Sequence, residues 1–160
     1  MRYAVKHLND LNKTLAGKAL EAVQFEQLVW SFRFGNYWIN ECASWRLCDS
    51  DGIYITSEDH EHSFGVGYPI DAKAEIEGQL SEYLIWKMEY IQSTGDLKLM
   101  FKRQENDYAT SKYLEVLSVS SGYESWTMTK SDDPNSLVLI GQPGNQIDAP
   151  IHQELIIQDN

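Results

Sequence analysis

The sequence predicts an α+β domain made mostly of antiparallel β-meanders, with one helix at the N-terminus and one central helix. Through most of the chain the apolar residues recur at every second position, which is the period of a half-buried strand. Aromatic residues make up 12% of the sequence, and strands accommodate such rings readily. Only two segments show helical spacing instead. We expect the strands to form two similar three-stranded units, joined either as a roll or as a sandwich.

The two predicted helices lie before each group of strands. Residues 2–15 carry apolar side chains at helical spacing, at Val5, Leu8, Leu11 and Leu15. Gly17 then ends this helix. Asp71 can cap a second helix, whose apolar face is formed by Ile76, Leu80 and Tyr83 or Leu84.

The first predicted meander covers residues 19–56. Val23 and Phe25 alternate with polar neighbours, Glu26-Gln27 forms a turn, and the next strand has one apolar face at Leu28, Trp30, Phe32 and Phe34. Gly35-Asn36 is a hairpin signal. The return strand runs over 37–48 and places Glu41 on its apolar face, between Ile39 and Ala43. A turn at 49–52 leads into a strand over 53–56, and 57–69 is a polar loop.

The second predicted meander follows the central helix. Its strands alternate around Trp86, Met88 and Tyr90, and then at Leu97, Leu99 and Phe101. Residues 104–110 read as a polar loop, 113–118 and 124–129 as strands, 132–135 as a turn and 137–140 as the last strand. Ser44-Trp45-Arg46-Leu47 in the first meander is similar to Ser125-Trp126-Thr127-Met128 in the second. Either the chain contains an internal duplication or two unrelated meanders look alike.

Length and composition predict a single domain over 1–160, with 146–160 a candidate for a loose C-terminal tail. On one strand, Cys42 and Cys48 would lie roughly 20 Å apart, too far for a disulfide. Two buried thiols suit a reducing cytoplasm. We find no signal-peptide pattern and no apolar run long enough to span a bilayer, so we expect a cytoplasmic protein and no membrane partner.

The formal net charge of −11 is unevenly distributed. From Leu47 to Ala72 there are six acids and no Lys or Arg, and from Ser131 to Asn160 there are five acids and no base. Such a field disfavours nucleic acid and would attract a basic protein, although acidity also keeps proteins soluble. The candidate partner-binding residues are Asp49, Asp51, Glu58, Asp59, Glu61 and, on a strand face opposite the core, Trp38. The other four tryptophans are expected in the core.

Glu58-Asp59-His60-Glu61-His62 is the one cluster with metal-ligand character. On an extended chain His60 and His62 share a side and could bind zinc or another divalent ion, with His152 or an acid completing the set. The alternative is a solvated acidic loop. We find no phosphate-binding loop, dinucleotide fingerprint or nucleophile elbow, so the sequence favours a non-enzymatic protein without a cofactor.

Three segments carry a resemblance to a known family: Asn40–Leu47, Tyr123–Trp126 and Leu137–Gly144. Over about 15–145 the chain resembles a family of small bacterial proteins of unassigned function, some of which are similar to immunity proteins that accompany secreted toxins. The resemblance implies a binding protein and brings no catalytic residues. The acidic stretch 49–61 is outside the shared pattern.

Three functions follow in order of preference. The first is an acidic protein-binding domain, such as an immunity or regulatory protein that neutralises a basic partner. The second is a metal-binding protein or metal-dependent enzyme that uses His60 and His62. The third is a small-ligand-binding β domain with a pocket between sheet and helix. Exposed strand edges could also pair two copies of the chain into a homodimer.

Overall fold

A computed structural model describes residues 2–65, 67–103, 111–121 and 124–143 of the chain. The first half contains α1 (Arg2–Leu15), β1 (Leu20–Glu26), β2 (Val29–Phe34), β3 (Tyr37–Cys42), β4 (Ser44–Asp49), β5 (Gly52–Thr56) and a 3₁₀ turn over Ser57–Asp59. The second half contains α2 (Ala72–Leu80), β6 (Leu84–Ile91), β7 (Asp96–Lys102), β8 (Lys112–Leu117), β9 (Thr127–Lys130) and β10 (Asp133–Ile140). The predicted α+β class and both helices are confirmed.

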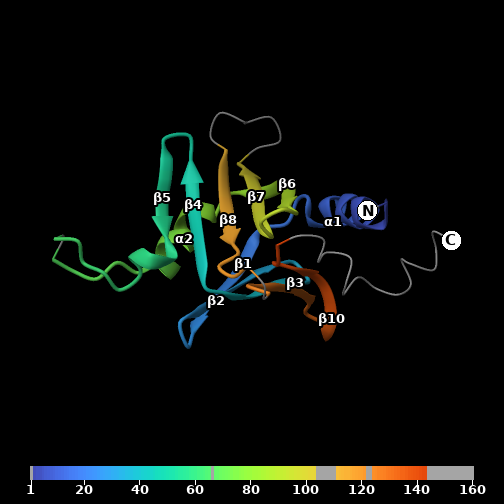
Figure 1. Ribbon diagram of the computed structural model, residues 1–160. Coiled ribbons are helices and arrows are strands. Elements are labelled where there is room, and N and C mark those ends of the chain that lie inside the picture. The colour runs from blue at the N-terminus through green and yellow to red at the C-terminus, as the bar shows by residue number, and fades with distance from the viewer. Residues whose placement is uncertain (1, 66, 104–110, 122–123, 144–160) are drawn as a thin grey trace.

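The ten strands form two antiparallel five-stranded sheets (Figure 1). One has the order β1-β2-β3-β9-β10 and the other the order β6-β7-β8-β4-β5. Each sheet is therefore a three-stranded meander from one half of the chain, completed by a hairpin from the other half. The two predicted three-stranded units are therefore present, and each is extended to five strands because the return strand over 37–48 divides between the sheets.

The division of that strand has a local cause. Glu41 has a φ of +61° and is an extra residue opposite β2, where the β2–β3 register shifts between Trp30 and Phe32. This bulge bends the chain out of the first sheet, and Ala43 separates β3 from β4. Glu41 and Ala43 are both exposed rather than on the apolar face that the alternating pattern predicted.

The two halves match in register as well as in element order. In β1–β2 the core pairs are Leu20 with Phe34, Val23 with Phe32 and Phe25 with Trp30. In β6–β7 they are Ile85 with Phe101, Met88 with Leu99 and Tyr90 with Leu97. A bulge occurs at the same place in both, after Leu20 and after Ile85. Each paired residue of β1 and β2 therefore has a register counterpart in β6 and β7.

The core lies between the sheets and under the helices. Trp30, Trp45 and Trp126 are fully buried, as predicted, and Trp30 meets Trp45 edge to face at 5.1 Å. Helix α1 packs on β6 through Leu11 and Leu15, and α2 packs on β1 through Ile76 and Leu80. Cys42 and Cys48 are buried free thiols, as expected, although they lie on strands of different sheets.

Most remaining differences from the predictions occur at turns. The first turn is Gln27-Leu28 rather than Glu26-Gln27, Leu84 belongs to β6 rather than to the apolar face of α2, and β10 begins at Asp133. Strand β9 begins at Thr127 rather than Glu124. The predicted loop over 104–110 and the tail over 146–160 lie outside the described residues. Neither described helix combines the length and apolar character that crossing a bilayer requires.

Candidate functional site

A hollow of about 540 Å³ opens between the β1–β2 hairpin and the loop that follows β5. Its apolar wall consists of Phe25, Leu28, Trp30 and Ala43, and its polar wall of Ser57, Glu58, His60, Glu61 and His62. We call this site the acidic hollow. The hairpin and the loop both project on the left of the view in Figure 1.

His60 holds the loop against the hairpin. Its Nδ1 accepts a hydrogen bond from the backbone N–H of Ala72 at 3.1 Å, in the first turn of α2. Its ring packs edge to face on Phe25 at 4.8 Å and on Trp30 at 5.0 Å. A second hollow of about 370 Å³, lined by Asp71 and Lys73 among others, lies on the other side of His60 and Phe25. The imidazole is therefore a structural wedge between two hollows.

The backbone around the acidic hollow is strained. Among the described residues, the non-glycine residues with positive φ are Gln27, Leu28, Glu41, Glu61 and Phe64. Gln27 and Leu28 form the two-residue turn of the hairpin, where such angles match the twist of the strands. Glu61 and Phe64 lie in the opposite loop. Strain of this kind collects at ligand clamps and binding loops more often than elsewhere.

Exposed apolar side chains concentrate at the same end of the molecule. Leu28 at the tip of the hairpin is 82% exposed, and Phe64 and Tyr68 in the loop are each 67% exposed. Ile53 and Tyr54, near the β4–β5 turn at the other end of β5, are exposed as well. The other large exposed apolar residues in the described part of the chain are Leu84, Ile91 and Val119. A cluster of exposed apolar side chains with carboxylates around it is typical of a protein interface.

The predicted acidic residues divide into two groups. Asp49 accepts a hydrogen bond from the N–H of Asp51 at 2.8 Å, which stabilises the β4–β5 turn, at the opposite end of β5 from the hollow. Asp59 accepts one from the N–H of Thr56 at 2.9 Å and stabilises the 3₁₀ turn. Glu58 and Glu61 are exposed and line the hollow. The structure therefore brings only two of the five predicted acids to this site.

Trp38, predicted as an exposed contact, lies away from the hollow on β3. It is on the strand face that the alternation predicted, but it is half-buried because the guanidinium of Arg33 lies over its ring, 5.8 Å from the centroid. It does not line the acidic hollow.

The two histidines of the predicted metal site have separate surroundings. His60 uses Nδ1 as the acceptor for Ala72, and its Nε2 lies 3.7 Å from Glu61. His62 is exposed and stacks on Phe64, with ring centroids 5.5 Å apart. In the described part of the chain, no three His, Cys, Asp or Glu residues come close enough together to hold a metal ion. His152 lies outside the described residues.

The described part of the second half differs from the first at one wall of the acidic hollow. The strand registers make Gly141 the counterpart of Ser57, Tyr90 that of Phe25 and Trp126 that of Trp45. A Cβ on Gly141 would lie 2.0 Å from the indole Nε1 of Trp126, so backbone covers this ring directly. The hydroxyl of Tyr90 donates to the carbonyl of Ile140 at 2.8 Å. Ser57 therefore lines a hollow, whereas Gly141 at the counterpart position covers the ring of Trp126.

Sequence reasoning found the polar wall of this site and missed its apolar wall. The sequence predicted Leu28 on a buried strand face, because Leu28 is two residues from Trp30 and would share its face on an extended strand. The available signal was the short polar break at Glu26-Gln27, which is equally compatible with a turn one residue later. No protein-family model, curated protein or solved structure matches this chain.

Proposed function

We propose that this chain is a non-enzymatic, cytoplasmic protein-binding domain that docks a basic segment of another protein over the acidic hollow. The observation that carries the proposal is the difference between the halves. The backbone of Gly141 covers Trp126, whereas the counterpart of Gly141, Ser57, lines the acidic hollow, where exposed apolar groups and carboxylates gather.

The chemistry of the hollow indicates the kind of partner. Glu58 and Glu61 offer carboxylates at its rim, while Phe25 and Leu28 offer apolar contacts. A segment with Lys or Arg beside apolar residues would complement both walls. The net charge of −11 would accelerate the encounter with such a partner at low ionic strength. The resemblance to immunity proteins supports the same role, in which the partner would be a basic toxin.

Selection from a random peptide display library against the immobilised full chain tests the proposal. Peptides rich in Lys and Arg should be enriched at low ionic strength and lost at moderate ionic strength. A Glu58→Gln/Glu61→Gln variant should bind the selected peptides about tenfold more weakly, since two exposed ion pairs contribute about 0.2–1 kcal/mol each. Leu28→Asn should also weaken binding, because it removes the apolar contact while asparagine tolerates the positive φ.

Matched control variants are available on other surfaces. Glu124→Gln removes an exposed acid, and Val119→Asn removes an exposed apolar side chain, both away from the hollow. Neither should change binding. The proposal would be wrong if the selected peptides had no basic character, or if the control variants weakened binding as much as the variants in the hollow.

A further inference from the structure

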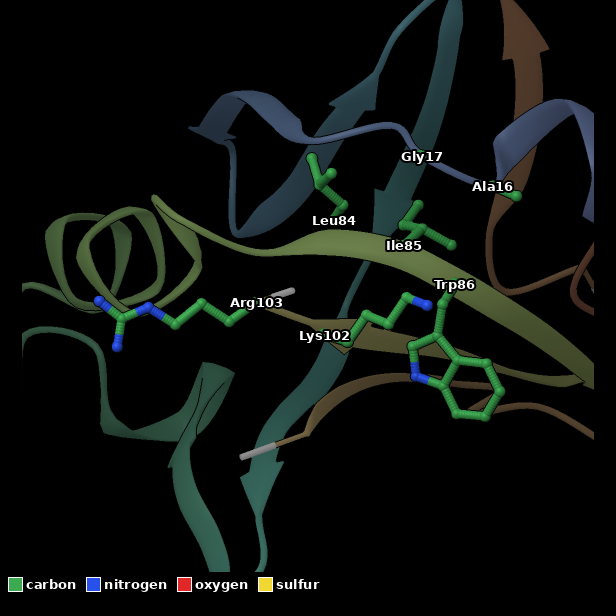
Figure 2. Close-up of a pocket in the computed structure, with 7 residues that line it drawn as sticks. All are labelled: Ala16, Gly17, Leu84, Ile85, Trp86, Lys102 and Arg103. Atoms are coloured by element: carbon green, nitrogen blue, oxygen red, sulfur yellow. The ribbon is translucent and has the colours of Figure 1, made fainter. Parts of the chain in front are cut away.

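A cavity of about 380 Å³ lies between residues 16–17 and the paired ends of β6 and β7 (Figure 2). Trp86 lies on its wall because the pairing of β6 with β7 shifts between Ile85 and Lys87, which makes Trp86 an extra residue on β6. Its ring is therefore half-buried, and the prediction that it fills the core was wrong. Trp86 and Lys102 both interact with other groups of the chain, so we assign no ligand to this cavity.

A smaller hollow lies on the other face of the β1–β2 hairpin from the acidic hollow, beside the bulge in β3. Its volume is about 160 Å³. This is below the roughly 300–1,000 Å³ that is usual for small-molecule sites, and it suits the end of one long side chain. Its polar lining comes from Gln24, Glu26, Gln27, Ser31, Asn40 and Glu41. We call it the Ser31 hollow.

The alternation of side chains along the hairpin separates the two hollows. Phe25 and Trp30, a cross-strand pair, both line the acidic hollow. The neighbouring pair, Gln24 and Ser31, lines the Ser31 hollow. Successive residues of a strand point to opposite faces of the sheet, which accounts for this arrangement. A partner segment that crosses the tip of the hairpin can therefore contact both hollows.

Glu41 lines the Ser31 hollow because of the bulge in β3. Its φ of +61° and its extra position opposite β2 bring it out of the regular alternation, and its side chain is exposed. Bulges often re-aim a side chain beside a binding site. The pairing of β7 with β8, which corresponds in register, runs from Leu97 to Phe101 without a shift. The fold therefore does not require a bulge at this position.

The Ser31 hollow offers hydrogen-bond acceptors and has no cation on its wall. In the described part of the chain, the carboxylates of Glu26 and Glu41 form no ion pair and the amide of Gln24 forms no side-chain hydrogen bond. Asn40 donates through its amide nitrogen to the hydroxyl of Thr129 at 3.0 Å, which leaves its carbonyl oxygen as an acceptor. A cationic group with several N–H donors would complement this lining.

The second half of the chain carries a cation at the counterpart position. The registers of the two hairpins make Lys98 the counterpart of Ser31. Lys98 pairs in register with Glu89 of β6 and with Glu115 of β8, and its ammonium nitrogen lies 4.2 Å from the ring centroid of Tyr113. The short side chain of Ser31 cannot extend in this way. The Ser31 hollow is therefore at the place where the other sheet accommodates a cationic side chain of the chain itself.

We infer that the Ser31 hollow binds the guanidinium group of an arginine side chain of the protein partner. The inference rests on the proposed function for the source of that arginine. A guanidinium has five N–H donors in a fixed plane, so it can bond to the carboxylates of Glu26 and Glu41 and to neighbouring amide oxygens together. A lysine ammonium has three donors on a flexible stem and would satisfy fewer of these acceptors. The apolar residues of the same segment would occupy the acidic hollow.

Titration of the isotope-labelled full chain with methylguanidinium tests the inference without the partner. The side-chain amide resonances of Gln24, Gln27 and Asn40 report on the hollow. They should shift along a saturable curve with half-saturation at about 10 mM, because a probe with so few atoms gains little free energy. Methylurea lacks the charge and methylammonium lacks the planar donors, so both should bind at least about fivefold more weakly. Shifts without saturation, or equal half-saturation for methylguanidinium and either other probe, would overturn the inference.

Two variants locate the binding. Glu26→Gln/Glu41→Gln should weaken methylguanidinium binding about fivefold, as expected for the loss of two exposed ion pairs. Asp51→Asn/Glu124→Gln removes the same charge from exposed positions outside the hollow and should leave the binding unchanged. Ser31→Lys, which introduces the counterpart residue, should fill the hollow and abolish binding. Its control is Ser50→Lys, which adds the same charge at the exposed β4–β5 turn. Retained affinity in Ser31→Lys, with its unfolding midpoint unchanged, would place the binding elsewhere and overturn the inference.

The inference and the proposed function fail through different results. Saturable methylguanidinium binding without enrichment of basic peptides would contradict the proposed function alone. Enriched peptides that keep their full affinity after every arginine is replaced by lysine would contradict the inference alone.

Discussion

The indole Nε1 of Trp126 donates a hydrogen bond to the carbonyl oxygen of Gly95, 3.1 Å away inside the core. The counterpart residue, Trp45, is equally buried, but its Nε1 has no acceptor in the described part of the chain. The turn between β6 and β7 supplies Gly95, whereas the turn between β1 and β2 is shorter and consists of Gln27 and Leu28. The longer β6–β7 turn therefore supplies an acceptor for the indole of Trp126, whereas the shorter β1–β2 turn supplies none for that of Trp45.

This difference predicts unequal effects of the same substitution. Trp126→Phe should lower the free energy of unfolding by about 1 kcal/mol more than Trp45→Phe does, because only Trp126 loses a hydrogen bond. Both variants lose the same ring volume, so the packing loss is largely matched. Urea unfolding of the two variants measures the difference. Equal destabilisation would contradict the assignment of the hydrogen bond.

A methyl group at Gly141 should destabilise the fold strongly. The added Cβ would lie 2.0 Å from the indole of Trp126, so Gly141→Ala should lower the free energy of unfolding by about 3 kcal/mol or more. Gly78→Ala in α2 is the control, since no atom lies within 4 Å of its Cβ. This control should raise the stability by about 0.5–1 kcal/mol through helix propensity. Thermal and urea unfolding of both variants would check these signs.

The two histidines of the loop should differ in their effect on stability. His60→Ala removes two aromatic contacts and the acceptor for the N–H of Ala72, so a loss of about 2 kcal/mol is expected. His62→Ala removes an exposed ring and should change the stability by less than about 0.5 kcal/mol. Comparable losses in the two variants would show that His60 is not the wedge described here.

The stability should fall in alkaline solution because of Cys42. Burial raises the pKa of this thiol far above its ordinary value, and the charge of Glu41 raises it further. The native state therefore retains a proton that the unfolded state releases above about pH 9. Stability is complete below that pH and decreases as the pH rises, by at most about 1.4 kcal/mol per pH unit for one group.

Urea unfolding as a function of pH measures this slope, and Cys42→Ala should reduce it. The pKa of Tyr90 is also raised, chiefly by burial, so the variant should retain part of the slope. An unchanged slope in Cys42→Ala would show that other groups account for the alkaline loss.

The alternation of side chains was sufficient to predict most strands and the cap of α2. Asp71 accepts a hydrogen bond from the N–H of Ala74 at 3.1 Å, as its position before the helix suggested. The Ser-Trp repeat also marks the corresponding strands β4 and β9, because Trp45 precedes Arg46, which pairs with Glu115 of β8, and Trp126 precedes Thr127, which pairs with Asn40 of β3.

What the sequence did not reveal depends on backbone geometry and on contacts between distant segments. The positive φ of Glu41 interrupts an alternation of side chains that otherwise continues through residue 48. A glutamate at this position gives no indication of that backbone angle. Leu28 and Trp86 are both at the alternate positions that are buried elsewhere in their strands. The β1–β2 turn places Leu28 beside a hollow instead, and the bulge in β6 does the same for Trp86. The apolar wall of the acidic hollow could not be predicted, because it comes from segments that are distant in the sequence from the loop after β5.

The exchange of hairpins between the sheets sets the order of events during synthesis. When residues 1–60 have left the ribosome, β3 and β4 each lack a strand neighbour, because their partners β9 and β8 have not been made. Both sheets become complete only after residue 140 has been made. Contacts this distant in sequence make folding slow. The nascent first half therefore exposes two unpaired strand edges, and chaperones that protect such edges should associate with it.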